Sequence, residues 1–420
     1  MNARPESRSR PADPQSAALA VLLAVALFLG AWGLMHHWFY RHSQIVDTPV
    51  YQRYGDAIAH GQVPYRDFAL EYPPGALPMF ALPGLAEQGH GQDVTAGFRH
   101  LFETLMWFCG AIALLGMAAV LRVSGASRAH VWSALLFAAL APLALGSVLL
   151  SRYDLWPTAL VVASLAALVT GRLRLGGGVL GAAITAKLFP AVLVPLAVAF
   201  AWRRQGRREA VICLATICAV VAVVFAPFVA LSPAGVWHSL TDQLTRPLQI
   251  ESLGAALLIA AHHVWGHPVT METSHGSQNL AGHAAHELAF ASTVLQVLAL
   301  IAIWTIFARS RATPAQLLSA SAASLVAFIA LGKVLSPQFL IWLVPVVPLV
   351  RGRTGLRASA LLGVALVLTQ IWFPFRYSDY ATHFQPTASW LVLARDVTLV
   401  VLLVALMAPR HTRATRPAHL

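Results

Sequence analysis

Apolar segments separated by short polar connections make up most of the chain, in the pattern of a protein that crosses a membrane many times. Full crossings are predicted over residues 17–36, 98–121, 129–150, 155–170, 209–230, 288–308, 315–331, 338–350, 358–373 and 388–408. Residues 176–201 are a further apolar stretch, but basic residues flank both of its ends and Pro190 interrupts it. This stretch predicts two short helices that enter the membrane and return. The expected fold is an all-α polytopic bundle of about 10–12 transmembrane helices with one broken, re-entrant helix pair.

Two long polar segments, residues 37–97 and 231–287, interrupt the apolar pattern. Within the first, Tyr51, Tyr54 and Ile58 recur at helical spacing and predict a short amphipathic helix over residues 48–59, with Asp47 at the N-cap. The prolines and aromatic residues after this helix predict an ordered loop rather than a disordered one. A loop of this length in a compact protein is usually functional, so we expect a site here.

Arginines concentrate in the short connections and at both chain ends, which is the positive-inside pattern. It predicts that the tails, residues 1–16 and 409–420, are cytoplasmic and that residues 17–408 form a single transmembrane domain. The two long segments, with most of the 17 acidic residues, then lie on the outer face.

Composition also indicates a membrane protein, and it argues against a soluble domain, a nucleic-acid-binding protein and a disulfide-stabilised protein. The chain of 420 residues is 58% hydrophobic and 11% charged, whereas a soluble domain carries about 25% charged residues. The net charge of +12 comes from the basic connections and does not indicate nucleic-acid binding. The three cysteines lie inside apolar segments and do not indicate a disulfide framework.

Charged residues next to apolar segments are the candidate binding groups. The chain has two lysines, Lys187 and Lys333, and a charge at membrane depth is costly unless it is paired or functional. Lys333 could instead extend to the membrane surface. Arg152 and Asp154 follow the third span and could simply pair with each other.

The second long segment adds Asp242, Arg246 and Glu251 to the same face, followed by six histidines between residues 262 and 286. The histidines form no compact metal-ligand set, and a structural role is the simpler interpretation. Cations that converge near a bilayer boundary suit an anionic lipid headgroup such as a phosphate. The sequence contains no nucleotide-binding loop and no hydrolase motif of the common types.

The order of several short motifs resembles the GT-C superfamily of integral-membrane glycosyltransferases, and within it glycosyltransferase family 87. The motifs are the first-loop array from Asp47 to Pro74, SRYDLWP at residues 151–157, AKLFPAVLVP at 186–195, RPLQIES at 246–252 and GKVLSPQFLIW at 332–342. The resemblance implies a cavity open to lipid, a polyprenyl-phosphate-sugar donor, most often of mannose, and transfer with inversion to a lipid or glycan acceptor. It implies no cofactor, and because Thr48 follows Asp47 where many relatives have a second acidic residue, metal dependence is not expected.

The resemblance also assigns roles to individual residues. Asp47 is the expected general base, which a partly desolvated carboxylate can be, and Asp56 is the second candidate. The helix N-cap is the alternative role of Asp47. The expected binders of the donor phosphate are Arg152, Lys187, Lys333 and Arg246. The expected substrate contacts are Tyr51, Tyr65, Glu71, Asp154, Glu251 and Gln338.

Two other functional classes stay open from the sequence. A transporter or flippase of a polyprenyl-linked glycan would need ionisable residues along a path through several spans, whereas here they gather at the outer boundary and in the broken helix pair. A structural subunit without activity is the second alternative, and the carboxylate-rich first loop counts against it.

Overall fold

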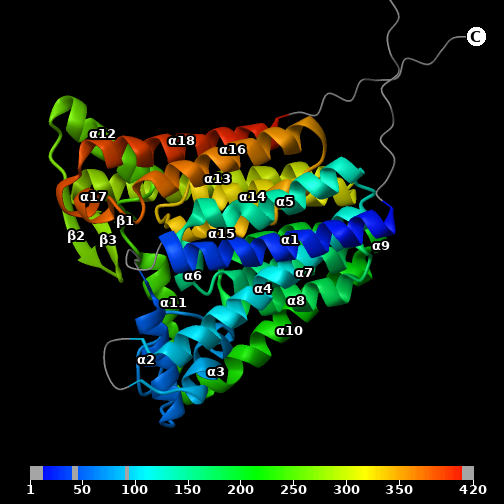
Figure 1. The fold of residues 1–420 in the computed structure, drawn as a ribbon, viewed down its shortest axis with the longest axis horizontal. Helices are drawn as coiled ribbons and strands as arrows, with labels where there is room; N and C mark the ends of the chain where they lie inside the picture. The colour runs from blue at the N-terminus through cyan, green and yellow to red at the C-terminus, as the bar shows by residue number, and fades with distance from the viewer. Residues whose placement is uncertain (1–12, 40–45, 90–93, 409–420) are drawn as a thin grey trace, which may run out of the picture.

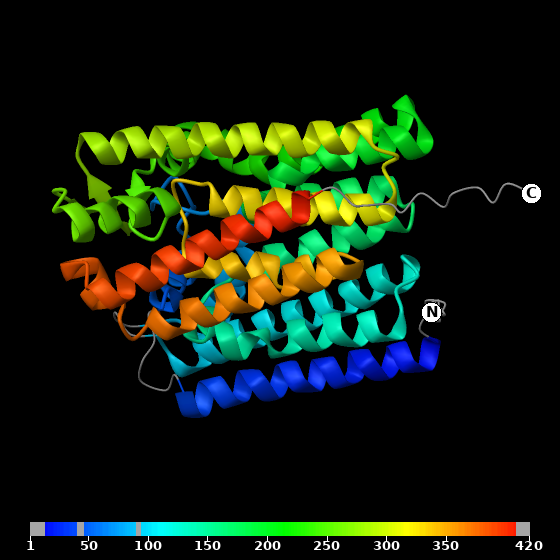
Figure 2. The ribbon, with the colours of Figure 1, turned by 90° about the horizontal axis from the view of Figure 1, so that it is seen from above.

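The computed structural model describes residues 13–39, 46–89 and 94–408; the predicted tails lie almost entirely outside these ranges. Long helices run side by side through the molecule, and shorter elements gather at one end of them (Figures 1 and 2). The long helices are α1 (Pro14–Leu34), α4 (Ala96–Val123), α5 (Arg128–Leu145), α7 (Leu155–Val169), α10 (Arg207–Leu231), α13 (His283–Arg309), α14 (Pro314–Ala330), α16 (Gly352–Trp372) and α18 (Pro386–Met407). Seven of the described helices are long and apolar enough to span a membrane, and α7 and α14 are shorter apolar helices. The all-α polytopic prediction is therefore confirmed.

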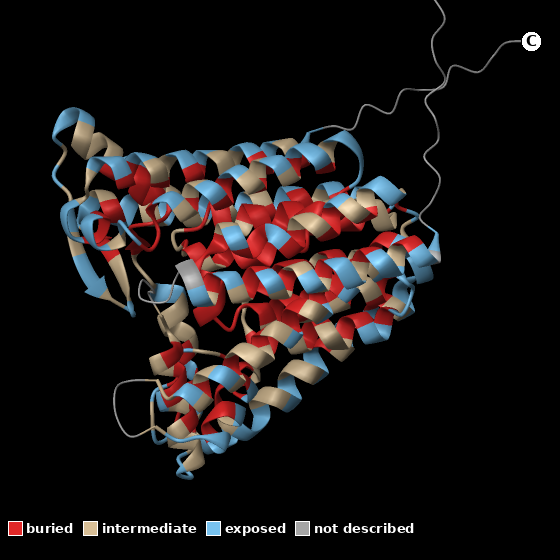
Figure 3. Cartoon of the chain, in the orientation of Figure 1, coloured by how far each residue is buried: buried red, intermediate tan, exposed pale blue. Residues whose placement is uncertain are grey.

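The long helices bury small and apolar side chains against one another in the middle of the bundle, as Figure 3 shows. Large apolar side chains are exposed instead on α10 and α13, where Val223 is 71% and Phe290 is 67% exposed. Exposed apolar area of this kind belongs against lipid rather than water. Hydroxyl side chains cap several helices, and at α14 Thr313 and Gln316 form a capping box.

The basic connections lie together at one end of the bundle, which we call the basic end. Arg351 donates to the carbonyls of Ser124 and Gly125, and Arg203 donates to the carbonyl of Ser310. These bonds join connections that are far apart in the sequence. The helix α1 begins, and α18 ends, toward this end, on the right in Figures 1 and 2. We call the opposite end the site end.

The broken helix pair is present as α8 (Leu173–Ala186), a 3₁₀ segment (Phe189–Leu193) and α9 (Val194–Gln205). Gln205 donates through its side chain to the Gly171 carbonyl, at 3.2 Å, so the pair starts and finishes at the basic end. Its apex therefore points into the bundle and carries Lys187, which ends α8.

Two predicted crossings are interrupted. Residues 129–150 form α5 and a separate short helix α6 (Ser147–Ser151), because Gly146 adopts a φ of 58° between them. Residues 338–350 do not form one helix but 3₁₀ turns (Pro337–Phe339 and Val347–Leu349) around α15 (Leu340–Leu343). Prolines in this stretch remove backbone donors, and nearly all of its residues are buried inside the bundle, where irregular backbone is tolerated at membrane depth.

The site end is built from the two long polar segments. The first contains α2 (Thr48–Ala59), as predicted, then a 3₁₀ turn (Pro74–Ala76) and α3 (Pro78–Ala86). The second contains α11 (Pro233–Thr245), α12 (Leu253–Trp265) and an antiparallel sheet in the order β1-β3-β2, formed by β1 (Leu248–Gln249), β2 (Thr270–Ser274) and β3 (Ser277–Ala281). The sheet was not predicted, since its strands are short and mostly polar. The short helix α17 (Tyr377–His383) lies beside it at the left end of Figure 1.

Candidate active site

A cavity of about 560 Å³ opens at the site end and draws its walls from segments far apart in the sequence. We call it the main cavity. Its walls come from the start of α2, the segment around Glu71, the α6–α7 junction, the apex of the α8–α9 pair, the segment after α11, the β2–β3 turn and residues 332–339. Eight of the predicted site residues line it: Asp47, Glu71, Arg152, Lys187, Arg246, Glu251, Lys333 and Gln338.

Four cations face this cavity. Lys187 lies 2.6 Å from Asp154 and Lys333 donates to the Leu244 carbonyl at 2.9 Å, while Arg152 forms an ion pair with Asp47. The Nε atoms of Arg152 and Arg246 are buried and have no hydrogen-bond partner among the described residues. Loss of hydration lowers the pKa of Arg246 and of Lys333. Cations that are poorly hydrated and incompletely paired attract an anion.

Asp47 directly precedes α2, but its side chain does not cap the helix. The carboxylate turns instead to Arg152 in the cavity wall, and the Tyr51 hydroxyl donates to it at 3.4 Å. The helix N-cap interpretation is therefore right for the position of Asp47 along the chain and wrong for its side chain. At this site the carboxylate faces both the cavity and a positive helix end.

Asp154 lies beneath the cavity floor and is fully buried. It accepts hydrogen bonds from Lys187 and from the Trp342 indole, both at 2.6 Å. The Lys187 ammonium also lies 4.8 Å from the ring centre of Tyr153 and 5.4 Å from that of Trp342. Asp154 pairs with Lys187 and Arg152 pairs with Asp47, so the alternative in which Arg152 and Asp154 simply pair with each other is wrong. The arrangement holds one ammonium at the apex of the broken helix pair in a fixed position.

Glu251 also lines the main cavity and is 2% exposed. The Gln249 side chain donates to it at 2.6 Å, and burial raises its pKa to about 7 against the pull of Arg395 and Arg152. Arg395 is fully buried in α18, pairs with Asp396 at 2.6 Å and donates to the Glu251 carbonyl at 2.8 Å. Arg395 and Asp396 were not among the predicted site residues. Two adjacent opposite charges inside the apolar segment 388–408 could have indicated a functional position, because charges at membrane depth are rare.

Four predicted site residues lie outside the main cavity. Asp56 accepts the Gly89 amide at 3.1 Å on another face of α2. Tyr51 is fully buried among aromatic rings, stacked on Phe80 with ring centres 4.6 Å apart. Tyr65 donates to the Tyr72 carbonyl at 2.6 Å, and Asp154 lies beneath the floor. Tyr377, Gln249 and Trp342 line the cavity but were not predicted as site residues.

Two histidines of the second long segment, His262 and His263, contact different partners and do not share a ligand. His262 contacts the His267 carbonyl at 2.8 Å, and His263 contacts the Ser389 hydroxyl at 3.1 Å. Among the described residues, no group of three or more His, Cys, Asp or Glu side chains could hold a metal ion.

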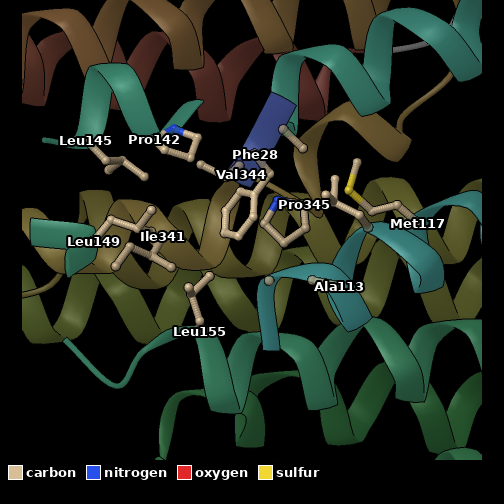
Figure 4. A pocket seen from close by; sticks show the side chains of 13 residues that line it. Phe28, Ala113, Met117, Pro142, Leu145, Leu149, Leu155, Ile341, Val344 and Pro345 are labelled. Atoms are coloured by element: carbon tan, nitrogen blue, oxygen red, sulfur yellow. The ribbon is translucent and has the colours of Figure 1, made fainter. Parts of the chain in front are cut away.

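A second, much smaller cavity of about 30 Å³ lies inside the bundle, between α1, α4 and residues 341–345. Figure 4 shows Phe28, Met117 and Ile341 among the side chains around it. All of its lining residues are apolar, so it offers no group for chemistry and is a packing defect of the kind that stays dry.

No curated protein matches the chain. The family model of glycosyltransferase family 87 matches residues 70–337, which is more than half of the chain and includes every cation of the main cavity. The match starts after Asp47, whose assignment therefore rests on the cavity geometry and on the motif order. The chain belongs to glycosyltransferase family 87 and is a glycosyltransferase that spans the membrane.

Proposed function

We propose that this glycosyltransferase moves a sugar, of which mannose is the first candidate, from a polyprenyl-phosphate donor to a hydroxyl group of a lipid or glycan acceptor. The observation that carries the proposal is the convergence of Arg152, Lys187, Arg246 and Lys333 on one cavity. Four cations around one space complement a phosphate that gains charge when its bond to the sugar breaks. They also provide the charge that a divalent metal would otherwise supply, so we expect activity without added metal.

The apolar part of the main cavity suits the lipid side of the donor. Leu188, Val192 and Phe328 line it next to Lys187, so a phosphate held by the cations leaves its prenyl chain against apolar side chains. A nucleotide-sugar donor would not use such a surface.

Asp47 is the proposed general base. The acceptor hydroxyl attacks the anomeric carbon and forms the new C–O bond while the bond from that carbon to the phosphate oxygen breaks. The electron pair leaves with the polyprenyl phosphate, and the hydroxyl proton passes to the Asp47 carboxylate. Attack on the face opposite the phosphate inverts the anomeric centre.

The ion pair between Asp47 and Arg152 would make donor binding precede activation of the base. A bound phosphate competes with Asp47 for the Arg152 guanidinium, and the carboxylate it frees becomes a stronger base. The base is thus released only when the donor is in place.

The orientation follows from the positive-inside rule. We place the basic end in the cytoplasm and the main cavity at the outer face of a bacterial inner membrane.

The test is a transfer assay with the protein in lipid nanodiscs, radiolabelled polyprenyl-phosphate-mannose as donor and a native membrane extract as acceptor. We expect transfer that persists in a metal chelator and that fails with a nucleotide sugar. The change Arg246→Gln should raise the donor KM about tenfold. Arg376→Gln is the matched control, because Arg376 is exposed at the site end and does not line the cavity. Transfer from the nucleotide sugar alone, or equal donor KM values for the two variants, would contradict the proposal.

A further inference from the structure

A third cavity, of about 420 Å³, lies on the outside of the first loop, and the proposed donor chemistry does not use it. We call it the outer cavity. Its walls come from residues 65–71, from one face of α11 and from the β2–β3 turn. None of these elements is among the candidate membrane spans or the other apolar helices.

The outer cavity shares a wall with the main cavity. Glu71, Gln243, His275 and Gly276 line both of them. The wall is fixed by the Gln243 side chain, which donates to the Glu71 carbonyl at 3.3 Å, and by the turn between β2 and β3. His275 and Gly276 form that two-residue turn with φ values of 53° and 65°, the backbone that tight hairpins require. A ligand in the outer cavity therefore lies next to the space where the donor sugar would be.

The two cavities differ in chemistry. The main cavity is lined by four cations and by the carboxylates of Asp47, Glu71 and Glu251. The outer cavity has no excess of cations: Arg66 pairs there with Asp67 at 2.8 Å, and the Asp242 carboxylate, the imidazoles of His238 and His275, and the Ser239 hydroxyl complete its polar lining. His238 and Asp242 are one helical turn apart on α11, with Nε2 and Oδ2 3.2 Å apart. Carboxylates accept hydrogen bonds from sugar hydroxyls, whereas imidazoles and hydroxyls can both donate and accept. The half-buried Phe68 ring lines the same cavity and offers a surface for a sugar ring, while Tyr65 is buried in its wall.

We propose that the outer cavity binds the acceptor, and that the acceptor is the end of a water-exposed saccharide rather than a lipid. The inference rests on the proposed function and adds the acceptor class to it. The saccharide lies against the His238–Asp242 pair and passes one hydroxyl across the shared wall beside Glu71. The hydroxyl oxygen bonds to the anomeric carbon, its proton goes to Asp47, and the polyprenyl phosphate leaves as described above.

The experiment measures transfer from polyprenyl-phosphate-mannose to soluble trisaccharides of mannose, arabinose or glucose, with the protein in nanodiscs. The outer-pair variant combines His238→Ala with Asp242→Ala. The matched control combines His283→Ala with Glu287→Ala, because this exposed pair at the start of α13 has the same spacing and lines neither cavity. Donor affinity is measured separately for each protein by saturation binding.

We expect saturable transfer to at least one trisaccharide. The outer-pair variant should raise the trisaccharide KM about tenfold, while its donor affinity and all values of the control pair stay at wild type. Equal trisaccharide KM values for the two pairs would overturn the inference. So would label that appears only in a chloroform-soluble lipid, or no transfer to any trisaccharide. If wild-type protein neither binds the donor nor releases sugar from it, the proposed function itself fails, and this result is distinct from the other outcomes.

Discussion

The Lys187 ammonium lies 2.6 Å from the carboxylate of Asp154, and the carboxylate is fully buried beneath the main cavity. The pair joins the apex of the broken helix pair to the start of α7. Lys187, one of the proposed phosphate-binding cations, is thus held in place by a counter-charge that lies outside the main cavity.

Removing one partner of this pair should cost more than removing both. Asp154→Asn leaves the Lys187 ammonium without its counter-charge and should destabilise the protein by about 3–5 kcal/mol. The double variant Asp154→Leu with Lys187→Met should recover much of that loss. Thermal unfolding in detergent measures the order of the melting temperatures. Glu209→Gln is the control, because its partner Arg174 is exposed at the basic end and exposed ion pairs contribute little to stability. A double variant less stable than Asp154→Asn would contradict this account.

Glu251 should make stability depend on pH. Burial raises its pKa from 4.5 to about 7, with Arg395, Arg152 and Arg246 opposing the shift and Asp396 adding to it. A raised carboxyl pKa means that the folded protein favours the neutral acid. The contribution is therefore complete below a pH of about 4.5 and is lost as the pH rises through about 7, with a magnitude of roughly 3 kcal/mol.

The melting temperature of the wild type should accordingly fall between about pH 5 and pH 8, and Glu251→Gln should flatten this dependence. Glu272→Gln, on exposed β2, should follow the wild type. Parallel profiles for the wild type and Glu251→Gln would show that Glu251 does not titrate in this range.

Gly55 should be intolerant of a methyl group. A Cβ at this position would overlap the Phe80 carbonyl oxygen, because α2 and α3 touch backbone to backbone at Gly55 and Gly84. Gly55→Ala should cost about 1–3 kcal/mol and lower the transfer rate, since displacement of α2 moves Asp47. Gly30→Ala in α1 is the control, because a Cβ there meets nothing within 4 Å. Equal stability and rates for the two variants would show that the α2–α3 contact can relax.

The sequence predicted the features that depend on local patterns. Helical spacing of Tyr51 and Tyr54 placed α2, and a lysine and a proline in an apolar stretch located the broken pair at Lys187. The same reasoning brought Asp47, Arg152 and Lys187 to one face, and the structure places them in one cavity.

The features that depend on tertiary contacts were not predicted. Nothing local shows that Asp56 turns toward Gly89, or that Asp154 accepts from Lys187 instead of Arg152. The sheet of β1, β2 and β3 is held by pairing across the second long segment, and its strands lack an apolar alternation. Residues 338–350 were predicted as a full crossing because they are apolar, yet their burial inside the bundle permits an irregular backbone.

The most direct test of the central claim compares Asp47→Asn with Asp56→Asn at matched expression, in the transfer of radiolabelled mannose from polyprenyl-phosphate-mannose. Asp47 directly precedes α2 and Asp56 lies within it. Of the two, only Asp47 lines the main cavity. We predict that Asp47→Asn lowers the rate at least about 100-fold with little change in donor affinity, and that Asp56→Asn stays near wild type. A wild-type rate for Asp47→Asn would contradict the account, and a loss confined to Asp56→Asn would place the base outside the cavity described here.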